Sequence, residues 1–303
     1  MRLQRKAWSQ GTFDKSSGMT VYVNGDFVSD DQAVISVFDR GLMYGDGCFE
    51  TIRVYNGKPA FWTEHLGRLC QTLKALFIPL VVDSGQLARV ARKLIEDDQV
   101  LNGVLRLQIT RGRGRRGYSM EGANHPSLIV SIHPLPPGIN ERSTAWKIRT
   151  SATHIDVESP IAGFKSSNKL LQILGKAEAE CHQVDDVLFL SRDGYASETS
   201  SSNLFWIDGE TICTPPLSVG ILPGITRQVI LEIFHGSKNP VQERLITLQE
   251  LLDQRVVFLT QSVWEILAVS SLDGHPCPQS PAIDSLRLQY RERALASEFP
   301  LTD

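Results

Sequence analysis

The chain carries the stretch Ser197-Glu198-Thr199-Ser200-Ser201-Ser202-Asn203-Leu204-Phe205, and Lys165 precedes it. A lysine amine can bind an aldehyde cofactor covalently, and a carboxylate can hold a protonated pyridine nitrogen so that the ring accepts electrons. Most lysines and glutamates are solvated surface residues, so Lys165 and Glu198 alone would indicate little. The interpretation of these two residues therefore depends on the sequence motifs that surround them.

Seven words occur in order along the chain: Val21-Tyr22-Val23-Asn24-Gly25, Tyr44-Gly45-Asp46-Gly47-Cys48-Phe49-Glu50-Thr51, Glu64-His65-Leu66-Gly67-Arg68-Leu69, Phe164-Lys165-Ser166-Ser167-Asn168, the Glu198 stretch, Leu222-Pro223-Gly224-Ile225-Thr226-Arg227, and Thr260-Gln261-Ser262-Val263-Trp264-Glu265-Ile266. Together they resemble the class IV aminotransferase family, the fold type IV pyridoxal phosphate enzymes. The resemblance covers roughly residues 20–275 and implies an α+β fold. In that fold a smaller N-terminal α/β domain and a larger C-terminal domain enclose pyridoxal 5'-phosphate between them.

Composition sets the broad class. The 303 residues can form two domains with a substantial core, and the net charge of -3 gives no general attraction to nucleic acid or to an anionic membrane. The N-terminal residues lack the apolar core of a signal peptide, which favours a cytoplasmic enzyme. Five scattered cysteines without C-x-x-C spacing predict neither a disulfide framework nor a metal site.

Periodicity and turn residues predict mixed helices and strands. We expect helices at 63–77, 86–97, 167–182, 226–234 and 248–252, and strands at 21–28 (a hairpin turning at Asn24-Gly25), 49–55, 104–110, 127–133, 186–190, 195–198, 204–207 and 256–260. The run Pro134-Leu135-Pro136-Pro137-Gly138 interrupts both helix and sheet. We therefore expect a flexible leader at 1–18, a small domain at 19–135, a linker at 136–142 and a cofactor-binding domain at 143–303.

The chain has the groups that a phosphate ester needs, namely a fixed cation, backbone donors and hydroxyls. Arg68 matches the family's phosphate-binding arginine, although by itself it also fits a surface arginine on a helix. Gly224 precedes a helix start, so the N–H groups of Ile225 and Thr226 and the Thr226 hydroxyl can face an anion; a plain helix N-cap fits equally well. Gln261 and Ser262 match a phosphate-contacting position, with a polar strand end as the alternative.

The resemblance also implies the remaining cofactor roles. Lys165 would hold the cofactor and move the proton, which requires a lowered amine pKa, and Glu198 would stay ionised beside the ring nitrogen. Asn203 would support the Glu198 stretch, although a turn role explains it as well. Phe49 and Glu50 match positions that line the site, whereas a strand Phe is more often part of the core.

The loop Gly112-Arg113-Gly114-Arg115-Arg116-Gly117 fits the G-x-G-x-x-G pattern of dinucleotide-binding proteins and follows a strand. The residues after it predict no helix, so the match is coincidental. Its four arginines, counted from Arg111, suggest a remote alternative in which the loop binds RNA phosphates.

The same loop selects the substrate within the family. Thr110 to Ser119 resembles the R-G-x-G-x-R-G-Y-S word of 4-amino-4-deoxychorismate lyases, which form 4-aminobenzoate for folate. Arg116 would bind a substrate carboxylate, with Tyr118 and Phe49 beside it. D-amino-acid aminotransferases carry R-x-H here, but the serine-rich stretch resembles theirs, so that alternative stays open. Leu170 and Thr51 depart from the branched-chain pattern and make that activity less favoured.

The expected partner is a small-molecule amine that bears a carboxylate, with no nucleic acid, membrane or metal involved. The resemblance further implies a homodimer in which the arginine loop reaches the site of the neighbouring subunit. Lyase and transaminase share the first proton removal, so the cofactor residues alone do not separate them.

Overall fold

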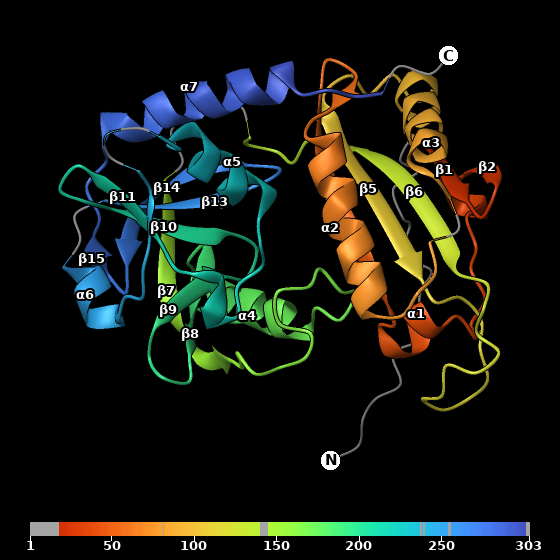
Figure 1. Cartoon of the computed structure of the whole chain (residues 1–303), viewed down its shortest axis with the longest axis horizontal. Coiled ribbons are helices and arrows are strands. Elements are labelled where there is room, and N and C mark those ends of the chain that lie inside the picture. The colour runs from red at the N-terminus through yellow and green to blue at the C-terminus, as the bar shows by residue number, and fades with distance from the viewer. Residues whose placement is uncertain are drawn as a thin grey trace, which may run out of the picture.

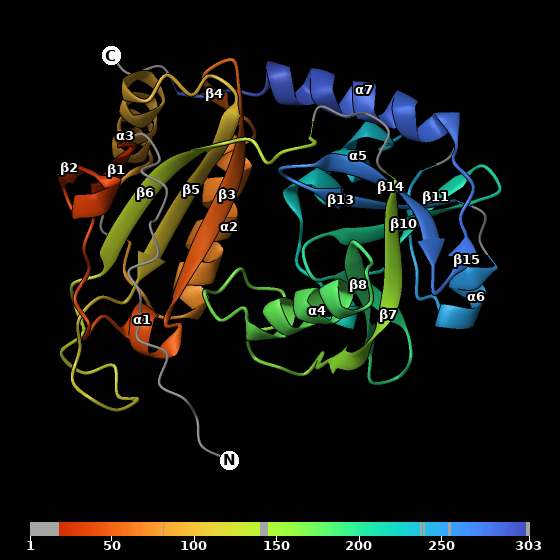
Figure 2. The same ribbon diagram turned by 180° about the vertical axis from the view of Figure 1, so that it is seen from behind.

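The structure, a computed structural model, describes residues 18–80, 82–139, 145–236, 238, 240–253 and 256–300. The chain forms two β-sheets that lie side by side, each accompanied by helices (Figures 1 and 2). The fold is therefore α+β, as the sequence predicts. The predicted leader lies outside the described residues except for Gly18, and so does the 140–142 part of the predicted linker.

The first sheet has six strands in the order β2-β1-β6-β5-β3-β4, and all of its pairings are antiparallel. Its strands are β1 (Thr20–Val23), β2 (Asp26–Ser29), β3 (Gly47–Tyr55), β4 (Lys58–Pro59), β5 (Gly103–Thr110) and β6 (Ser127–Pro134). Alternate residues such as Ile52, Leu107 and Val130 point to one face, where they form a core with α2 (Trp62–Ala75) and α3 (Ser84–Asp97). The other residues of these strands, among them Phe49, point to the opposite face.

The second sheet has nine strands in the order β12-β11-β10-β13-β14-β7-β8-β9, with β15 paired to β14. Its strands are β7 (Trp146–Ile155), β8 (Asp186–Ser191), β9 (Ala196–Thr199), β10 (Asn203–Asp208), β11 (Thr211–Thr214), β12 (Gln242–Glu243), β13 (Val256–Gln261), β14 (Glu265–Leu272) and β15 (His275–Pro276). Strand β9 also pairs with β10, through Glu198 opposite Asn203. This pairing closes six strands into a barrel. The segment that contains Glu198 lies where the first and last strands of the barrel meet.

The remaining helices are α1 (Arg40–Tyr44), α4 (Leu170–Cys181), α5 (Ile225–Ile233), α6 (Leu248–Leu252), α7 (Pro281–Ala296) and two 3₁₀ turns, η1 (Asp30–Gln32) and η2 (Leu217–Val219). Helices α5 and α7 share an apolar core that includes Phe258 and Ile266 of the barrel. None of the described helices has the length and hydrophobicity that spanning a bilayer requires.

The end of the chain returns to the first sheet (Figure 1). The Phe299 ring packs edge-on against Trp62 with ring centroids 5.1 Å apart, and the Ser297 hydroxyl accepts a hydrogen bond from the Phe61 N–H (3.0 Å). The C-terminal segment thus fastens the beginning of α2. The domain limits at 19–135 and 143–303 remain a prediction, and any such division has to include this returning segment.

Most predicted elements are confirmed to within a few residues, including the Asn24-Gly25 hairpin, whose two turn residues have positive φ. The predicted helix at 167–182 begins later, at Leu170, because residues near 166 pair with β3 instead. No element was predicted from the sequence at β7, β14 or α7. Their patterns are weak because β14 is almost wholly buried and α7 exposes much of its length.

Candidate active site

The backbone around Lys165 is attached to β3 of the first sheet. The Phe49 N–H donates to the Lys165 carbonyl (3.1 Å), the Ser167 N–H donates to the Gly47 carbonyl (2.8 Å), and Ser166 forms an isolated bridge with Cys48. A Cβ at Gly47 would lie 2.6 Å from the Ile109 carbonyl oxygen, so only glycine fits there. The position of the Lys165 backbone therefore depends on the contacts of its segment with β3.

Lys165 opens into a cavity of about 520 Å³ between the two sheets. Both halves of the chain line it. The predicted residues on its wall are Phe49, Arg68, Lys165, Glu198, Asn203, Ile225, Thr226, Gln261 and Ser262. The structure thus brings together every predicted cofactor residue, although these residues are spread from α2 to the turn after β13.

The Lys165 amine is suited to nucleophilic and proton-transfer chemistry. Burial, reinforced by the positive charge of Arg68, lowers the pKa of Lys165 to about 8, against an ordinary value of 10.5. A substantial fraction of the amine is then neutral near pH 8. The Lys165 Nζ lies 4.7 Å from the centre of the Phe49 ring, which keeps it next to an apolar surface.

Glu198 is held at the barrel closure by two donors. The Leu222 N–H (3.0 Å) and the Asn203 amide (3.1 Å) both donate to Glu198 Oε2, and the same Asn203 amide donates to the Leu222 carbonyl (2.9 Å). Burial raises the pKa of Glu198 to about 7, against the hydrogen bond from Leu222 and the charges of Lys169 and Lys165. In the chain by itself the carboxyl is only partly ionised at neutral pH, so the expected full ionisation requires a positive group beside it.

Arg68 is fixed by a buried acid. Its Nε donates to Glu50 Oε1 (2.8 Å) and its Nη2 to Glu50 Oε2 (2.7 Å), while Nη1 donates to the Pro223 carbonyl (3.0 Å). His65 Nδ1 also contacts Glu50 Oε2 (2.8 Å). Burial alone would raise the pKa of Glu50, but the bonds from Arg68 and His65 lower it to about 2. The predicted site residue Glu50 therefore orients the arginine from the helix side of β3.

The start of α5 faces the cavity with its backbone donors. Gly224 is the N-cap and has no side chain to occupy them, and a Cβ there would lie 2.0 Å from Asn203 Oδ1. The nearby Thr260 hydroxyl is buried on the cavity wall without a hydrogen-bond partner among the described residues. Gln261 donates to the Ser202 hydroxyl (3.0 Å), and the Thr226 hydroxyl lies 3.3 Å from that of Tyr290.

These features fit a phosphorylated pyridine aldehyde. Arg68, the N–H groups of Ile225 and Thr226, the unpartnered Thr260 hydroxyl and Ser262 can hold a phosphate. Lys165 can bind an aldehyde, and Glu198 can pair with a ring nitrogen. Two independent requirements of pyridoxal phosphate, a low-pKa lysine and a buried carboxyl, are thus met within one cavity.

Glu50, which was expected to line the site, lies behind Arg68 and not on the cavity wall, and two further predicted site residues, Arg116 and Tyr118, are not on that wall either. Both are exposed on the loop after β5, and the Tyr118 side chain is 87% exposed. Their predicted contact with the substrate is therefore not seen at the cavity of the single chain.

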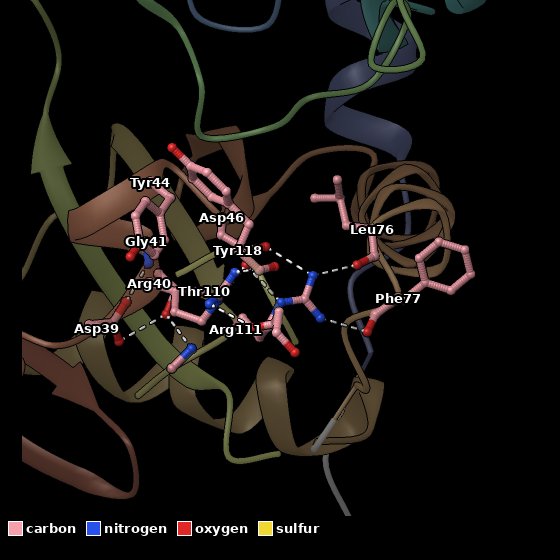
Figure 3. A network of polar contacts seen from close by, with 12 residues as sticks. Asp39, Arg40, Gly41, Tyr44, Asp46, Leu76, Phe77, Thr110, Arg111 and Tyr118 are labelled. Carbon is pink, nitrogen blue, oxygen red and sulfur yellow. Dashed lines mark hydrogen bonds and ion pairs between the residues drawn. The ribbon is translucent and has the colours of Figure 1, made fainter. Parts of the chain in front are cut away.

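Arg111 is not available for the RNA-binding alternative. Its guanidinium is buried, donates to Asp46 through Nε (2.7 Å) and Nη2 (2.9 Å), and bonds the carbonyls of Leu76 and Phe77 (Figure 3). It cannot also neutralise a nucleic-acid phosphate. The glycines of the loop serve close packing: a Cβ at Gly112 would lie 1.8 Å from the His125 carbonyl oxygen. No helix follows among residues 118–126, as expected for a coincidental pattern.

Three residues at or near the site were not predicted from the sequence: Thr260 and Lys169 on the cavity wall, and Arg106 beside Phe49. The Arg106 guanidinium carbon lies 4.2 Å from the centre of the same Phe49 ring that contacts Lys165, and Arg106 Nη2 donates to Gln108 Oε1 (3.1 Å). No acid pairs with it among the described residues. The available signal was strand alternation, which puts Arg106 on the same face of the first sheet as Phe49 and Thr51.

Comparison with known proteins defines the class. The family model for class IV amino-transferases matches residues 47–272, and the chain belongs to this family. It is therefore a pyridoxal phosphate-dependent enzyme.

Individual relatives carry different activities in their names. A Methanocaldococcus jannaschii protein provisionally named a branched-chain-amino-acid aminotransferase is 32% identical (84% of this chain, 88% of that protein), and a Staphylococcus aureus D-alanine aminotransferase is 31% identical (84% and 90%). The crystal structure of 4-amino-4-deoxychorismate lyase from Pseudomonas aeruginosa is 32% identical, with a TM-score of 0.79 over 90% of this chain and 98% of that one. Because the sequence identities to these differently named relatives are nearly equal, the reaction has to be inferred from the residues of the site.

Proposed function

We propose that this enzyme is a 4-amino-4-deoxychorismate lyase, which converts aminodeoxychorismate into 4-aminobenzoate and pyruvate. The loop carrying Arg116-Gly117-Tyr118 is the observation on which this choice rests. The substrate bears two carboxylates. Arg106, which does not itself line the cavity, lies against the Phe49 ring of the cavity wall and has no acidic partner among the described residues. Two cations for two carboxylates favour a dianionic substrate.

The chain's own residues have distinct roles in this reaction. When bound, the cofactor supplies an electron sink for the bond broken at the amine-bearing carbon. Arg68, the α5 N-terminus and Ser262 hold its phosphate, and Glu198 holds its ring nitrogen. Lys165, neutral in part near pH 8, accepts the proton from the amine-bearing carbon.

The elimination balances without a further reactant. Loss of the proton to Lys165 is followed by cleavage of the neighbouring carbon–oxygen bond, and the departing enolpyruvate takes up a proton to become pyruvate. The ring left behind is aromatic. A keto acid is not consumed, which distinguishes this reaction from amino transfer.

Arg116 and Tyr118 enter this proposal through a second copy of the chain. Because both are exposed and lie away from the cavity of their own chain, we propose a homodimer in which they reach the neighbouring cavity. Arg106 would then contact one carboxylate from within the chain and Arg116 the other from its neighbour. A cytoplasmic location fits this metabolic role and remains a prediction.

A transaminase is the second candidate function. The 31% identity to a D-alanine aminotransferase and the Ser200-Ser201-Ser202 segment on the cavity wall favour it. Such an enzyme would need only one carboxylate-binding cation near Lys165. It would also need a keto acid as the amino acceptor.

The deciding experiment is release of 4-aminobenzoate and pyruvate from enzymatically generated aminodeoxychorismate, with purified holoenzyme and no keto acid. Sustained turnover, many products per site, is expected, and Lys165→Ala should abolish it. Absence of product, together with bleaching of the cofactor absorbance on addition of D-alanine, would refute the lyase and support the transaminase.

A further inference from the structure

A buried charge cluster holds the start of the arginine loop, residues 111–119, in place. The Asp46 carboxylate accepts from Arg40 Nε (2.8 Å) and from Arg111 Nε and Nη2 (2.7 and 2.9 Å), as Figure 3 shows. Both arginine side chains are buried. Burial alone would raise the pKa of Asp46, but the bonds from Arg111 and Arg40 lower it, so the carboxylate is charged at neutral pH. Asp46 thereby joins α1, β3 and the start of the loop.

Arg40 uses its other donors on the loop backbone. Its Nη1 donates to the carbonyls of Gly117 (2.9 Å) and Ser119 (3.0 Å), and its Nη2 donates to the carbonyl of Tyr118 (3.3 Å). Three consecutive carbonyls are therefore fixed by one guanidinium, whose planar donors are suited to this task. A Cβ at Gly114 would lie 2.8 Å from Arg40 Cδ, so the loop also packs directly on the arginine stem.

Tyr44 extends the same support. Its hydroxyl accepts from the Gly117 N–H (3.1 Å), its ring lies 5.0 Å from the Arg40 guanidinium carbon, and its ring centre is 5.6 Å from that of Tyr118. The helix that carries Arg40 and Tyr44 is itself secured, since its N-cap Asp39 accepts from Gly41, Thr110 and Ser127.

The segment held in this way buries little of its own side chains. Tyr118 is 87% exposed, and Arg116 and Ser119 are exposed as well. Packing of these side chains therefore does not explain why the backbone of residues 117–119 accepts and donates so many hydrogen bonds. A loop fixed before it meets a ligand loses less conformational freedom on binding, which raises affinity without any additional contact.

We propose that Arg40, oriented by Asp46, is a positioning residue that preorganises Gly117–Ser119 so that Arg116 and Tyr118 meet a substrate carboxylate. This inference rests on the proposed substrate-binding role of the loop. It assigns to Arg40 a control over substrate affinity although the residue itself touches neither substrate nor cofactor. Since Asp46 keeps Arg111 as a partner, loss of Arg40 should leave the fold intact.

The test compares Arg40→Gln and Arg40→Lys with the exposed α3 variant Arg89→Gln as control, all as holoenzymes. Arg40→Gln should raise KM for aminodeoxychorismate about tenfold, because two rotamer-rich side chains must then be ordered during binding. We expect kcat and the Kd of pyridoxal phosphate to change less than threefold. Arg40→Lys keeps a positive charge beside Asp46 but cannot make all three carbonyl bonds, so its KM should lie between those of the wild type and Arg40→Gln. If Arg40→Gln fails to fold, the Arg40→Lys variant provides the test.

Two further measurements separate positioning from a general structural role. Amide hydrogen exchange at residues 118–121 without substrate should accelerate in Arg40→Gln and stay unchanged in Arg89→Gln. In Arg116→Ala, adding Arg40→Gln should raise KM by less than in the wild-type background, since one ordered side chain is already gone. An unchanged KM despite faster exchange, or a parallel loss of cofactor affinity, would overturn the inference.

The proposed function and this inference fail in different ways. If the wild type turns over D-alanine instead of aminodeoxychorismate, the lyase assignment is lost while the KM comparison is repeated on D-alanine, whose carboxylate probes the same loop. An Arg40→Gln enzyme that binds both substrates like the wild type would end the positioning proposal whichever reaction is catalysed.

Discussion

Replacing Glu50 with glutamine removes the anion that holds Arg68. Glu50 is fully buried, and its pKa is lowered from the ordinary 4.5 to about 2. At 1.36 kcal/mol per pKa unit this shift corresponds to a stabilisation of about 3 kcal/mol. Removing one partner of a buried pair typically costs about 3–5 kcal/mol, which agrees in magnitude. We therefore expect Glu50→Gln to lower the free energy of unfolding by about 3 kcal/mol at pH 7.

Urea unfolding of the apoprotein at several pH values is the assay. Because the folded-state pKa lies below the unfolded one, the contribution of Glu50 is complete above about pH 4.5 and disappears as pH falls toward about 2. The difference between wild type and Glu50→Gln should shrink over that range. The exposed Glu96→Gln on α3 is the control and should change stability by less than about 0.5 kcal/mol. A loss under about 1 kcal/mol for Glu50→Gln at pH 7 would refute the reasoning.

Three other predictions concern the cavity. The rate at which pyridoxal phosphate binds covalently to the apoprotein should fall about tenfold per pH unit below pH 8 and level off above it, since only the neutral Lys165 amine reacts. Borohydride trapping and mass spectrometry measure this rate. A flat profile between pH 6 and 8 would contradict the lowered pKa. Gly224→Ala should displace Asn203, weaken cofactor binding in equilibrium dialysis and destabilise the protein by about 1–3 kcal/mol, and unchanged binding would show that α5 can shift. Glu198→Gln should still load cofactor covalently but lower kcat at least about a hundredfold, which steady-state kinetics would test against Lys165→Ala, where no loading occurs.

Local sequence signals located most of the elements, and the reasons can be traced. The Asn24-Gly25 turn and the spacing of Leu66, Leu69 and Leu73 are chemical requirements of a hairpin and of a helix that buries one face. In β14 the burial of nearly every residue removes the alternation that marks a strand. In α7 the buried stripe is narrow, so the pattern is not distinctive.

The site divides in the same way. The sequence identified Lys165, Glu198 and Arg68 because the chemistry requires these residue types and each of them lies in a recognisable sequence motif. The bidentate bond between Arg68 and Glu50, and the position of Arg106 beside Phe49, depend on how α2 and β5 lie against β3, which no local pattern records. For Arg116 and Tyr118 the resemblance implied a substrate role in the site of a neighbouring subunit, which stays a prediction; in the structure neither residue lines the cavity of its own chain.

By itself the sequence determined the family, the cofactor chemistry and the residues able to perform it, because reactive side chains and turn glycines are local properties. Only the tertiary structure decided which charges meet. It lowered the pKa of Lys165, raised that of Glu198 and made Arg40 the support of the loop, because burial and ion pairing depend on segments distant in the chain.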